Sequence, residues 1–399
     1  MIHNDVDPGV SENMKYDFDT PVNRRGTYCY KWDVGDNELP MWIADMDFKT
    51  APGIIHELSE RIGHGIYGYA EVPDEWYDAY VHWWSSRHGF TIRREWLMFC
   101  TGVVAALSSI VRKLGSPNEN VVIQTPVYNI FYNSILNNGL RVLESPLVYD
   151  NGKYSMDLED LEKKFSDPQT SMFILCNPHN PVGKIWDHDT LKTIGEMALK
   201  HNVTVISDEI HCDITRPGTE YVPFASVSET CSNVSVSLIA PTKTFNLAGI
   251  QTAAIFAKDR LLFHKVWRAI NTDEVAEPNA LACPAAISAY YSGAGWLDEM
   301  REYVFENKEI VENFVSDCIP ELKVVKSDAT YLLWIDISGS GLSSTEFAGK
   351  LRSKTGLYIS DGKVYGGNGS AFLRMNVACP RQYVYDAMDR LTDFVKTIS

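Results

Sequence analysis

Short apolar runs recur through the middle of the 399-residue chain, and stretches with helical spacing separate them. These runs occupy residues 121–124, 172–176, 203–207, 234–240 and 252–256. Strands that are apolar on both faces are typical of a parallel sheet with helices on both sides. We therefore predict an α/β fold with a mostly parallel sheet in a large domain, and we expect ligands beyond the carboxyl ends of its strands.

The pattern changes beyond about residue 284. A long charged helix is predicted over 296–318, and amphipathic helices are predicted over 345–354 and 382–396. Residues 331–336 and 371–377 alternate between apolar and polar positions, which indicates half-buried strands. This part is therefore predicted to form a second, smaller α+β domain.

Near the start, aromatic residues and turn signals alternate over 14–49 and indicate an extended segment that packs on another part of the protein. Helices are predicted to follow over 51–62 and 76–88. The predicted division is an N-terminal segment over 14–60 that joins the small domain, a large domain over 61–284 and a small domain over 285–399. The first 13 residues are left unassigned.

A residue with useful chemistry follows four of the apolar runs. The four residues supply an aromatic ring (Tyr128), an amide (Asn180), a carboxylate (Asp208) and an amine (Lys243). Because ligands of parallel sheets sit beyond the carboxyl ends of the strands, these side chains are candidates for one site.

Lys243 stands just after a buried strand and a proline. A desolvated ammonium is costly, so it usually either finds a partner or loses its proton. A neutral amine can condense with an aldehyde, and the commonest aldehyde in protein chemistry is that of pyridoxal phosphate. The alternative is a lysine that simply begins a surface helix, and this stretch taken alone favours that alternative.

Composition narrows the class of protein. The formal net charge of −16 argues against general affinity for nucleic acid or for an anionic membrane. The eight cysteines are scattered singly, without a metal-binding pair, so we expect no metal site and reduced thiols in the cytoplasm. The N-terminus is unlike a signal peptide, and no apolar run is long enough to span a bilayer.

Six motifs together resemble the fold-type I pyridoxal-phosphate enzymes of the aminotransferase superfamily, and most closely the cystathionine β-lyase branch of MalY/PatB-type carbon–sulfur lyases. They lie at residues 44–48, 67–69, 177–183, 207–211, 243–246 and 374–376. Each motif alone is weak evidence for this family, whereas the joint order and spacing of the six motifs are specific to it. The resemblance implies a transferase-like fold that depends on pyridoxal 5′-phosphate.

By this resemblance Lys243 bonds covalently to the cofactor and then acts as the base that removes the substrate's α proton. Asp208 would pair with the pyridine nitrogen, although a strand-end carboxylate that caps a helix is the common alternative. Asn180 would bind the phenolic oxygen of the ring. His211 stands where many aminotransferases place a tyrosine for that oxygen, and a satisfied buried histidine is the alternative. Tyr128 would stack on the ring, although a tyrosine after a strand is more often part of the core.

The cofactor's phosphate needs hydrogen-bond donors and a positive potential, and a helix N-terminus supplies both. Gly102, Val103 and Val104 are predicted to form such a start, and Thr242 could add a hydroxyl. Tyr69 resembles the phosphate-binding tyrosine that a neighbouring subunit donates in this family. That resemblance implies a homodimer with shared active sites.

Arg374 is the candidate clamp for the substrate's α-carboxylate, because a guanidinium matches a carboxylate in a bidentate pair. Arg381 and Arg24 are the rival candidates. The predicted reaction is α,β-elimination on L-cystathionine or a related cysteine S-conjugate, which gives pyruvate, ammonia and a thiol. Tyr69 or Tyr128 could assist the departing sulfur.

Two alternatives remain open at this point. An aminotransferase would share the early steps, but many such enzymes carry an arginine eight residues after the lysine, where this chain has Gln251. A regulatory protein could keep the fold and act through protein contacts. The presence of Lys243, Asp208, Asn180 and Arg374 argues against loss of the chemistry.

Overall fold

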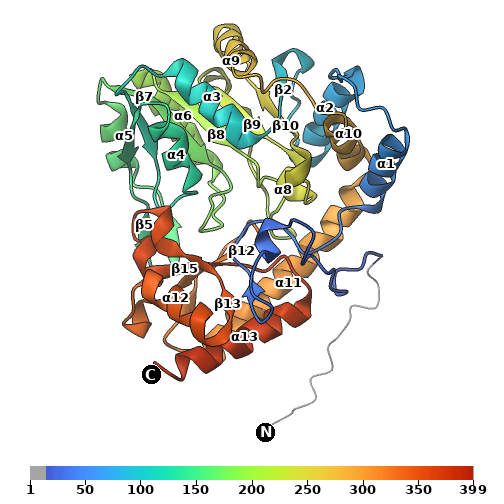
Figure 1. Cartoon of the computed structure of the whole chain (residues 1–399). Coiled ribbons are helices and arrows are strands. Elements are labelled where there is room, and N and C mark those ends of the chain that lie inside the picture. The colour runs from blue at the N-terminus through green and yellow to red at the C-terminus, as the bar shows by residue number, and fades with distance from the viewer. Residues whose placement is uncertain (1–14, 399) are drawn as a thin grey trace.

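The computed structural model describes residues 15–398, and it has a large lobe and a small lobe (Figure 1). The large lobe is built on a seven-stranded sheet with the spatial order β2-β10-β9-β8-β7-β3-β4. In chain order its strands are β2 (Leu97–Cys100), β3 (Asn120–Ile123), β4 (Arg141–Glu144), β7 (Thr170–Cys176), β8 (Thr204–Asp208), β9 (Ser235–Ile239) and β10 (Ala253–Phe256). Only β10 runs antiparallel to its neighbours, so the prediction of a mostly parallel sheet is confirmed.

Alternate residues of the central strands enter two different helical layers. In β7, Met172 and Ile174 pack with the layer of α3 (Val103–Leu114), α4 (Ile130–Leu136) and α9 (Arg260–Thr272). Phe173 and Leu175 instead pack with the layer of α5 (Leu158–Phe165), α6 (His188–His201) and α7 (Glu229–Asn233). Burial on both faces explains why these strands are continuously apolar in sequence.

The small lobe holds a four-stranded antiparallel sheet in the order β11-β12-β15-β14. Its strands are β11 (Lys323–Val324), β12 (Leu332–Asp336), β14 (Ser360–Asp361) and β15 (Phe372–Asn376). The helices are α11 (Ala294–Cys318), α12 (Ser344–Thr355) and α13 (Arg381–Val395). A capping box of Ser343 and Glu346 begins α12, since each satisfies a backbone N–H of the first turn.

Outside these groups, the described residues also form three further helices and two small strand pairs. They are α1 (Pro52–Gly63), α2 (Asp74–His88), α10 (Ala282–Ser292), the hairpin of β5 (Val148–Asp150) with β6 (Lys153–Ser155), and the parallel pair of β1 (Leu39–Pro40) with β13 (Leu357–Tyr358). The β1–β13 pair attaches the N-terminal segment to the small lobe. The proposed division at residues 60 and 284 stays a prediction, and the unassigned first 13 residues lie outside the part that the structure describes.

No helix within residues 15–398 combines the length and the apolar character needed to cross a bilayer.

A buried ion cluster fixes the N-terminal segment. Lys31 is buried, and its amine contacts Oδ2 of Asp47 at 2.6 Å. Arg24 contacts Asp47 at 2.6 Å and Asp45 at 2.6 Å. Asn376 of β15 donates to the carbonyls of Ile43 and Asp45 at 2.7 and 2.6 Å, so the cluster is tied to the small sheet.

Replacing Lys31 tests this arrangement. Lys31→Met leaves one oxygen of the buried Asp47 carboxylate without its cation, and we expect the free energy of unfolding to fall by about 3 kcal/mol. Denaturant unfolding followed by circular dichroism measures the change. Lys192→Met on the exposed face of α6 is the matched control and should stay within about 0.5 kcal/mol of the original protein. Equal losses in the two variants would contradict the role of the cluster.

Candidate active site

The carboxyl ends of neighbouring parallel strands bring the predicted site residues to one edge of the large sheet. Asp208 ends β8, and Cys176 at the end of β7 is its register partner. The loop after β7 carries Asn180, and α8 (Pro241–Thr244) after β9 carries Lys243. Arg374 comes from β15 of the small lobe. The site therefore lies where the two lobes meet.

Lys243 sits in the four-residue helix α8, which Pro241 begins at its first position. The lysine side chain is partly accessible, and its amine donates a hydrogen bond to the carbonyl oxygen of Ala44 at 2.5 Å. Burial of the amine lowers the pKa of Lys243 to about 8, and the positive charge of Arg374 acts in the same direction. The negative charges of Asp45 and Asp208 oppose this shift. A neutral amine is therefore accessible near neutral pH.

Asp208 is the buried carboxylate on the neighbouring strand, with 5% of its surface exposed. Burial raises the pKa of Asp208 to about 7, helped by the charge of Glu209, while the backbone N–H of Ile210 and the charge of Lys243 oppose the rise. Ile210 donates to Oδ1 at 3.1 Å. A cation placed beside this carboxylate would favour its ionised form, as a protonated pyridine nitrogen would.

His211 and Arg374 each keep a buried nitrogen without a hydrogen-bond partner among the described residues. These atoms are Nδ1 of His211 and Nε of Arg374. Burial, together with the positive charges of Lys243 and Arg374, lowers the pKa of His211 to about 3, so the imidazole is neutral. Buried polar groups normally have partners, so unpartnered atoms beside a reactive amine fit a pocket for a polar ligand.

Arg374 links the small lobe to the loop after β7. Its Nη1 donates to Oδ1 of Asn180 at 3.2 Å, its Nη2 donates to the carbonyl of Trp42 at 2.8 Å, and its guanidinium lies 4.9 Å from the ring centre of Tyr365. The two rival arginines are engaged elsewhere. Arg24 belongs to the N-terminal ion cluster, and Arg381 bonds to Glu306. This supports Arg374 as the clamp, which stays a prediction.

Tyr128 belongs to the same group of residues. Burial raises the pKa of Tyr128; the charge of Arg374 opposes this rise, and the charge of Asp208 adds to it. Its hydroxyl therefore stays protonated at neutral pH. Tyr69 lies apart from this group, with a relative exposure of 105% in the segment between α1 and α2. Within one chain, Tyr69 is thus on the surface.

The predicted phosphate site is the start of α3. Gly102 is its N-cap residue in an extended conformation, and no side chain caps the helix. The first N–H groups of a helix lack partners inside it, so those of Val103 and Val104 are suited to an anion. Gly102 has no atom within 4 Å of the position where a Cβ would stand, which leaves space beside the cap. Thr242 is buried in α8, on the lysine-bearing turn.

Sequence reasoning assigned no role to several residues that touch this site. Ala44 supplies the carbonyl that binds Lys243, and the hydroxyl of Tyr331 donates to the same carbonyl at 3.0 Å. Asp45 influences the pKa of Lys243. The motif at 44–48 was the available signal for Ala44 and Asp45. Tyr331 had no such signal, because it directly precedes β12 in a stretch whose sequence indicated only a strand.

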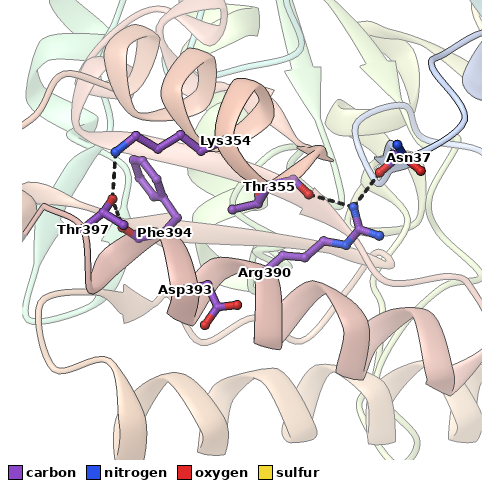
Figure 2. A pocket seen from close by; sticks show the side chains of 7 residues that line it. All are labelled: Asn37, Lys354, Thr355, Arg390, Asp393, Phe394 and Thr397. Atoms are coloured by element: carbon purple, nitrogen blue, oxygen red, sulfur yellow. Dashed lines mark hydrogen bonds between the residues drawn. The ribbon is translucent and has the colours of Figure 1, made fainter.

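Two other features are separate from this site. A surface cavity of about 480 Å³ lies between α12 and α13, where Arg390 donates to the carbonyls of Asn37 and Thr355 (Figure 2). No predicted site residue lines it. Potential metal-binding atoms of His88, Cys212 and Asp213 lie within 4.8 Å of one another, but hydrogen bonds already occupy the carboxylate of Asp213.

Comparison with known proteins gives consistent results. Residues 42–391 match the family described as aminotransferase class I and II. The chain is 41% identical over 380 residues to cystathionine β-lyase PatB of Bacillus subtilis (strain 168), covering 94% of this chain and 98% of the relative. It is 31% identical to protein MalY of Escherichia coli (strain K12), covering 96% and 100%.

A solved structure extends the comparison to the fold. Cystalysin from Treponema denticola, which contains a pyridoxal 5′-phosphate cofactor, is 30% identical and superimposes with a TM-score of 0.94. The match covers 97% of this chain and 100% of that chain. The predicted transferase-like fold is therefore confirmed over nearly the whole chain.

The charges around Lys243 make a testable prediction about its titration. In protein freed of any bound aldehyde, we expect the Lys243 amine to titrate near pH 8. Asp208→Asn should lower this midpoint, because a negative charge that favours the ammonium is lost, and Arg374→Leu should raise it. Competitive acetylation across a pH series, read by mass spectrometry, measures the midpoint. Arg381→Leu is the control and should not move it, whereas shifts of one sign in all three variants would contradict the site.

Proposed function

The chain belongs to the aminotransferase class I and II family, and from that premise we propose that it is a pyridoxal-phosphate-dependent carbon–sulfur β-lyase. The substrate is L-cystathionine or a related cysteine S-conjugate, and the products are pyruvate, ammonia and a thiol. The observation that carries the proposal is the buried amine of Lys243, electrostatically coupled to Asp208 and Arg374, in a chain 41% identical to a cystathionine β-lyase.

The residues present fit the cofactor. Lys243 would bond to its aldehyde, and Asp208 would hold the proton on its pyridine nitrogen. Asn180 and His211 would donate hydrogen bonds to its phenolic oxygen. The phosphate would take the N-terminus of α3, with Gly102, Val103, Val104 and Thr242. When bound, pyridoxal phosphate supplies an electron-withdrawing ring that accepts the electrons left on the substrate's α carbon.

Arg374 orients the substrate. A carboxylate can form a bidentate pair with its guanidinium, and the unpartnered Nε leaves hydrogen-bonding capacity for it. The other two guanidinium nitrogens donate hydrogen bonds to Asn180 and to the Trp42 carbonyl, so the orientation of the guanidinium is fixed before substrate binds. Preorganisation of this kind reduces the entropy lost when substrate binds.

Lys243 moves the proton. With a pKa of about 8, its Nζ can accept the α proton and return it later. The departing sulfur needs little acid assistance, since a free thiol has a pKa of about 8.5. Tyr128, whose raised pKa keeps the hydroxyl protonated, would donate a hydrogen bond to it. The unsaturated amine that is released hydrolyses to pyruvate and ammonia.

Transamination is the second candidate function, and the family description alone favours it. Gln251, where many aminotransferases have an arginine, weighs against it. Gln251 lies exposed in the left-handed region at φ +59°, at the end of a short 3₁₀ helix. A purely regulatory role finds no specific observation in its favour, because the residues needed for chemistry are in place.

An elimination assay separates these functions. With pyridoxal phosphate and L-cystathionine but no added keto acid, we expect pyruvate and thiol to form in equal amounts. Lys243→Ala should lower the rate about 10³-fold, because the covalent anchor and the base are lost together. Coupled detection of pyruvate and thiol titration measure the products, with Lys192→Met as the active control. A strict requirement for keto acid would instead establish transamination.

A homodimer with shared active sites is part of the proposal. Several large apolar side chains are exposed close together at and after the end of α1, namely Ile62, Ile66, Tyr67 and Tyr69. Contiguous exposed apolar residues mark interaction surfaces. A second copy that covers this segment would receive Tyr69 at its phosphate site. The eight free cysteines support a cytoplasmic location.

Mixing two inactive variants tests the sharing of sites. In a dimer of one Lys243→Ala chain and one Tyr69→Ala chain, one site carries both defects and the other carries neither. Random subunit exchange should therefore restore about a quarter of the original activity. Pyruvate release after co-refolding measures it, and each variant refolded alone is the control. Activity that stays at the level of the separate variants would show that each site is built from one chain.

A further inference from the structure

Asp213 is a buried carboxylate outside the group of residues described above. It has 3% of its surface exposed and follows β8 in the loop that also carries His211. Its Oδ2 accepts a hydrogen bond from the hydroxyl of Thr244 at 2.8 Å. Its Oδ1 accepts hydrogen bonds from Nε1 of Trp83 and Nε2 of His88, both at 2.9 Å. Three separate segments of the chain therefore meet at this carboxylate.

The partners of Asp213 decide what it can do. Thr244 is the last residue of α8 and directly follows Lys243. Trp83 and His88 belong to α2, and Trp83 is part of the hydrophobic core. Asp213 thus connects the lysine-bearing turn to the loop after Asp208 and to a helix of the core.

The lysine-bearing turn needs such a connection. The helix α8 has only four residues, so its own hydrogen bonds cannot hold it in place. The backbone bonds that surround it are Phe245 to Pro241 and Leu247 to Thr242, both at 2.9 Å and both within the turn itself. Side chains link the turn to other segments: Asn246 bonds to the backbone of Met46 and Phe48, and Thr244 bonds to the loop after β8.

The charge of Asp213 strengthens this contact. Burial opposes the ionisation of Asp213. The hydrogen bond and charge of His88, together with the hydrogen bonds of Thr244 and Trp83, outweigh burial and lower the pKa of Asp213. Hydrogen bonds to an ionised acceptor are roughly twice as strong as neutral ones.

A second carboxylate, that of Glu209, links the same loop to strand β9. Glu209 of the same loop accepts a hydrogen bond from Ser237 of β9 at 3.1 Å and another from the hydroxyl of Tyr221. Ser237 is six residues before Lys243, inside the strand. The sheet already fixes β9 there, whereas the Asp213 contact acts next to the reactive amine.

We propose that Asp213 is a positioning residue that holds Thr244, and with it the backbone of Lys243, at a fixed distance from the loop that follows Asp208 and carries His211. The inference rests on the proposed function. It assigns no contact between Asp213 and the substrate or the cofactor. Its effect is geometric, and a displacement of about 1 Å at a reacting group can cost about 100-fold in rate.

Thr244→Val tests the inference directly, because valine keeps the shape of the side chain and removes the hydroxyl. We expect kcat for pyruvate release to fall about tenfold, with KM within about twofold of the original, since Arg374 still binds the substrate. The rate at which the visible absorption band forms on adding pyridoxal phosphate to cofactor-free protein should fall in parallel. Thr244→Ser restores the hydroxyl and should restore both rates.

Thr252→Val is the matched control. Thr252 is fully buried nearby in sequence, and its hydroxyl has no hydrogen-bond partner among the described residues, so the same substitution removes no contact. Unchanged rates in Thr244→Val, or equal losses in both valine variants, would overturn the positioning role, as would failure of serine to rescue. Absence of the visible band in the original protein would instead refute the proposed function.

Discussion

The structure depends on keeping an amine, a carboxylate and a guanidinium close together in a largely buried place. The charges of Asp208 and Arg374 act on Lys243 with opposite signs, and burial outweighs both in setting its pKa. Such groups are expensive to desolvate, so the fold must supply rigid elements that hold them. The parallel strands provide two of the groups from adjacent carboxyl ends, and the small lobe provides the third.

The N-terminal segment completes this arrangement from the other side. Its carbonyl at Ala44 binds Lys243, and Tyr331 of the small lobe donates to the same oxygen. The buried cluster around Lys31 and Asp47 fixes the segment, and β1 pairs with β13. Loss of this segment would therefore remove one wall of the site as well as part of the small lobe.

Local patterns made much of this predictable. The five apolar runs fall on β3, β7, β8, β9 and β10, because burial on both faces leaves a continuous apolar signal. The edge strands β2 and β4 were not predicted. The residues of β4, which starts at Arg141, are partly exposed and mixed in character. Contacts such as Tyr331 with Ala44 join residues 287 positions apart, and no local pattern encodes them. Likewise, only the likeness to a family suggested that Tyr69 contributes to the site of a neighbouring subunit.

The directions of the pKa shifts of Asp208 and Lys243 explain why a cofactor suits the site. Asp208 rises from 3.8 to about 7, so the folded protein holds a proton that the unfolded chain releases, and this group lowers stability as the pH rises through that window. Lys243 falls from 10.5 to about 8, so the unfolded chain holds the extra proton between these values, and its charge in the folded protein is unfavourable below about pH 8. Near neutral pH the ionised form of each group therefore exists at a cost to folding. A ligand that places a cation beside the carboxylate and bonds covalently to the amine relieves both costs, and a pyridine ring carrying an aldehyde has both properties.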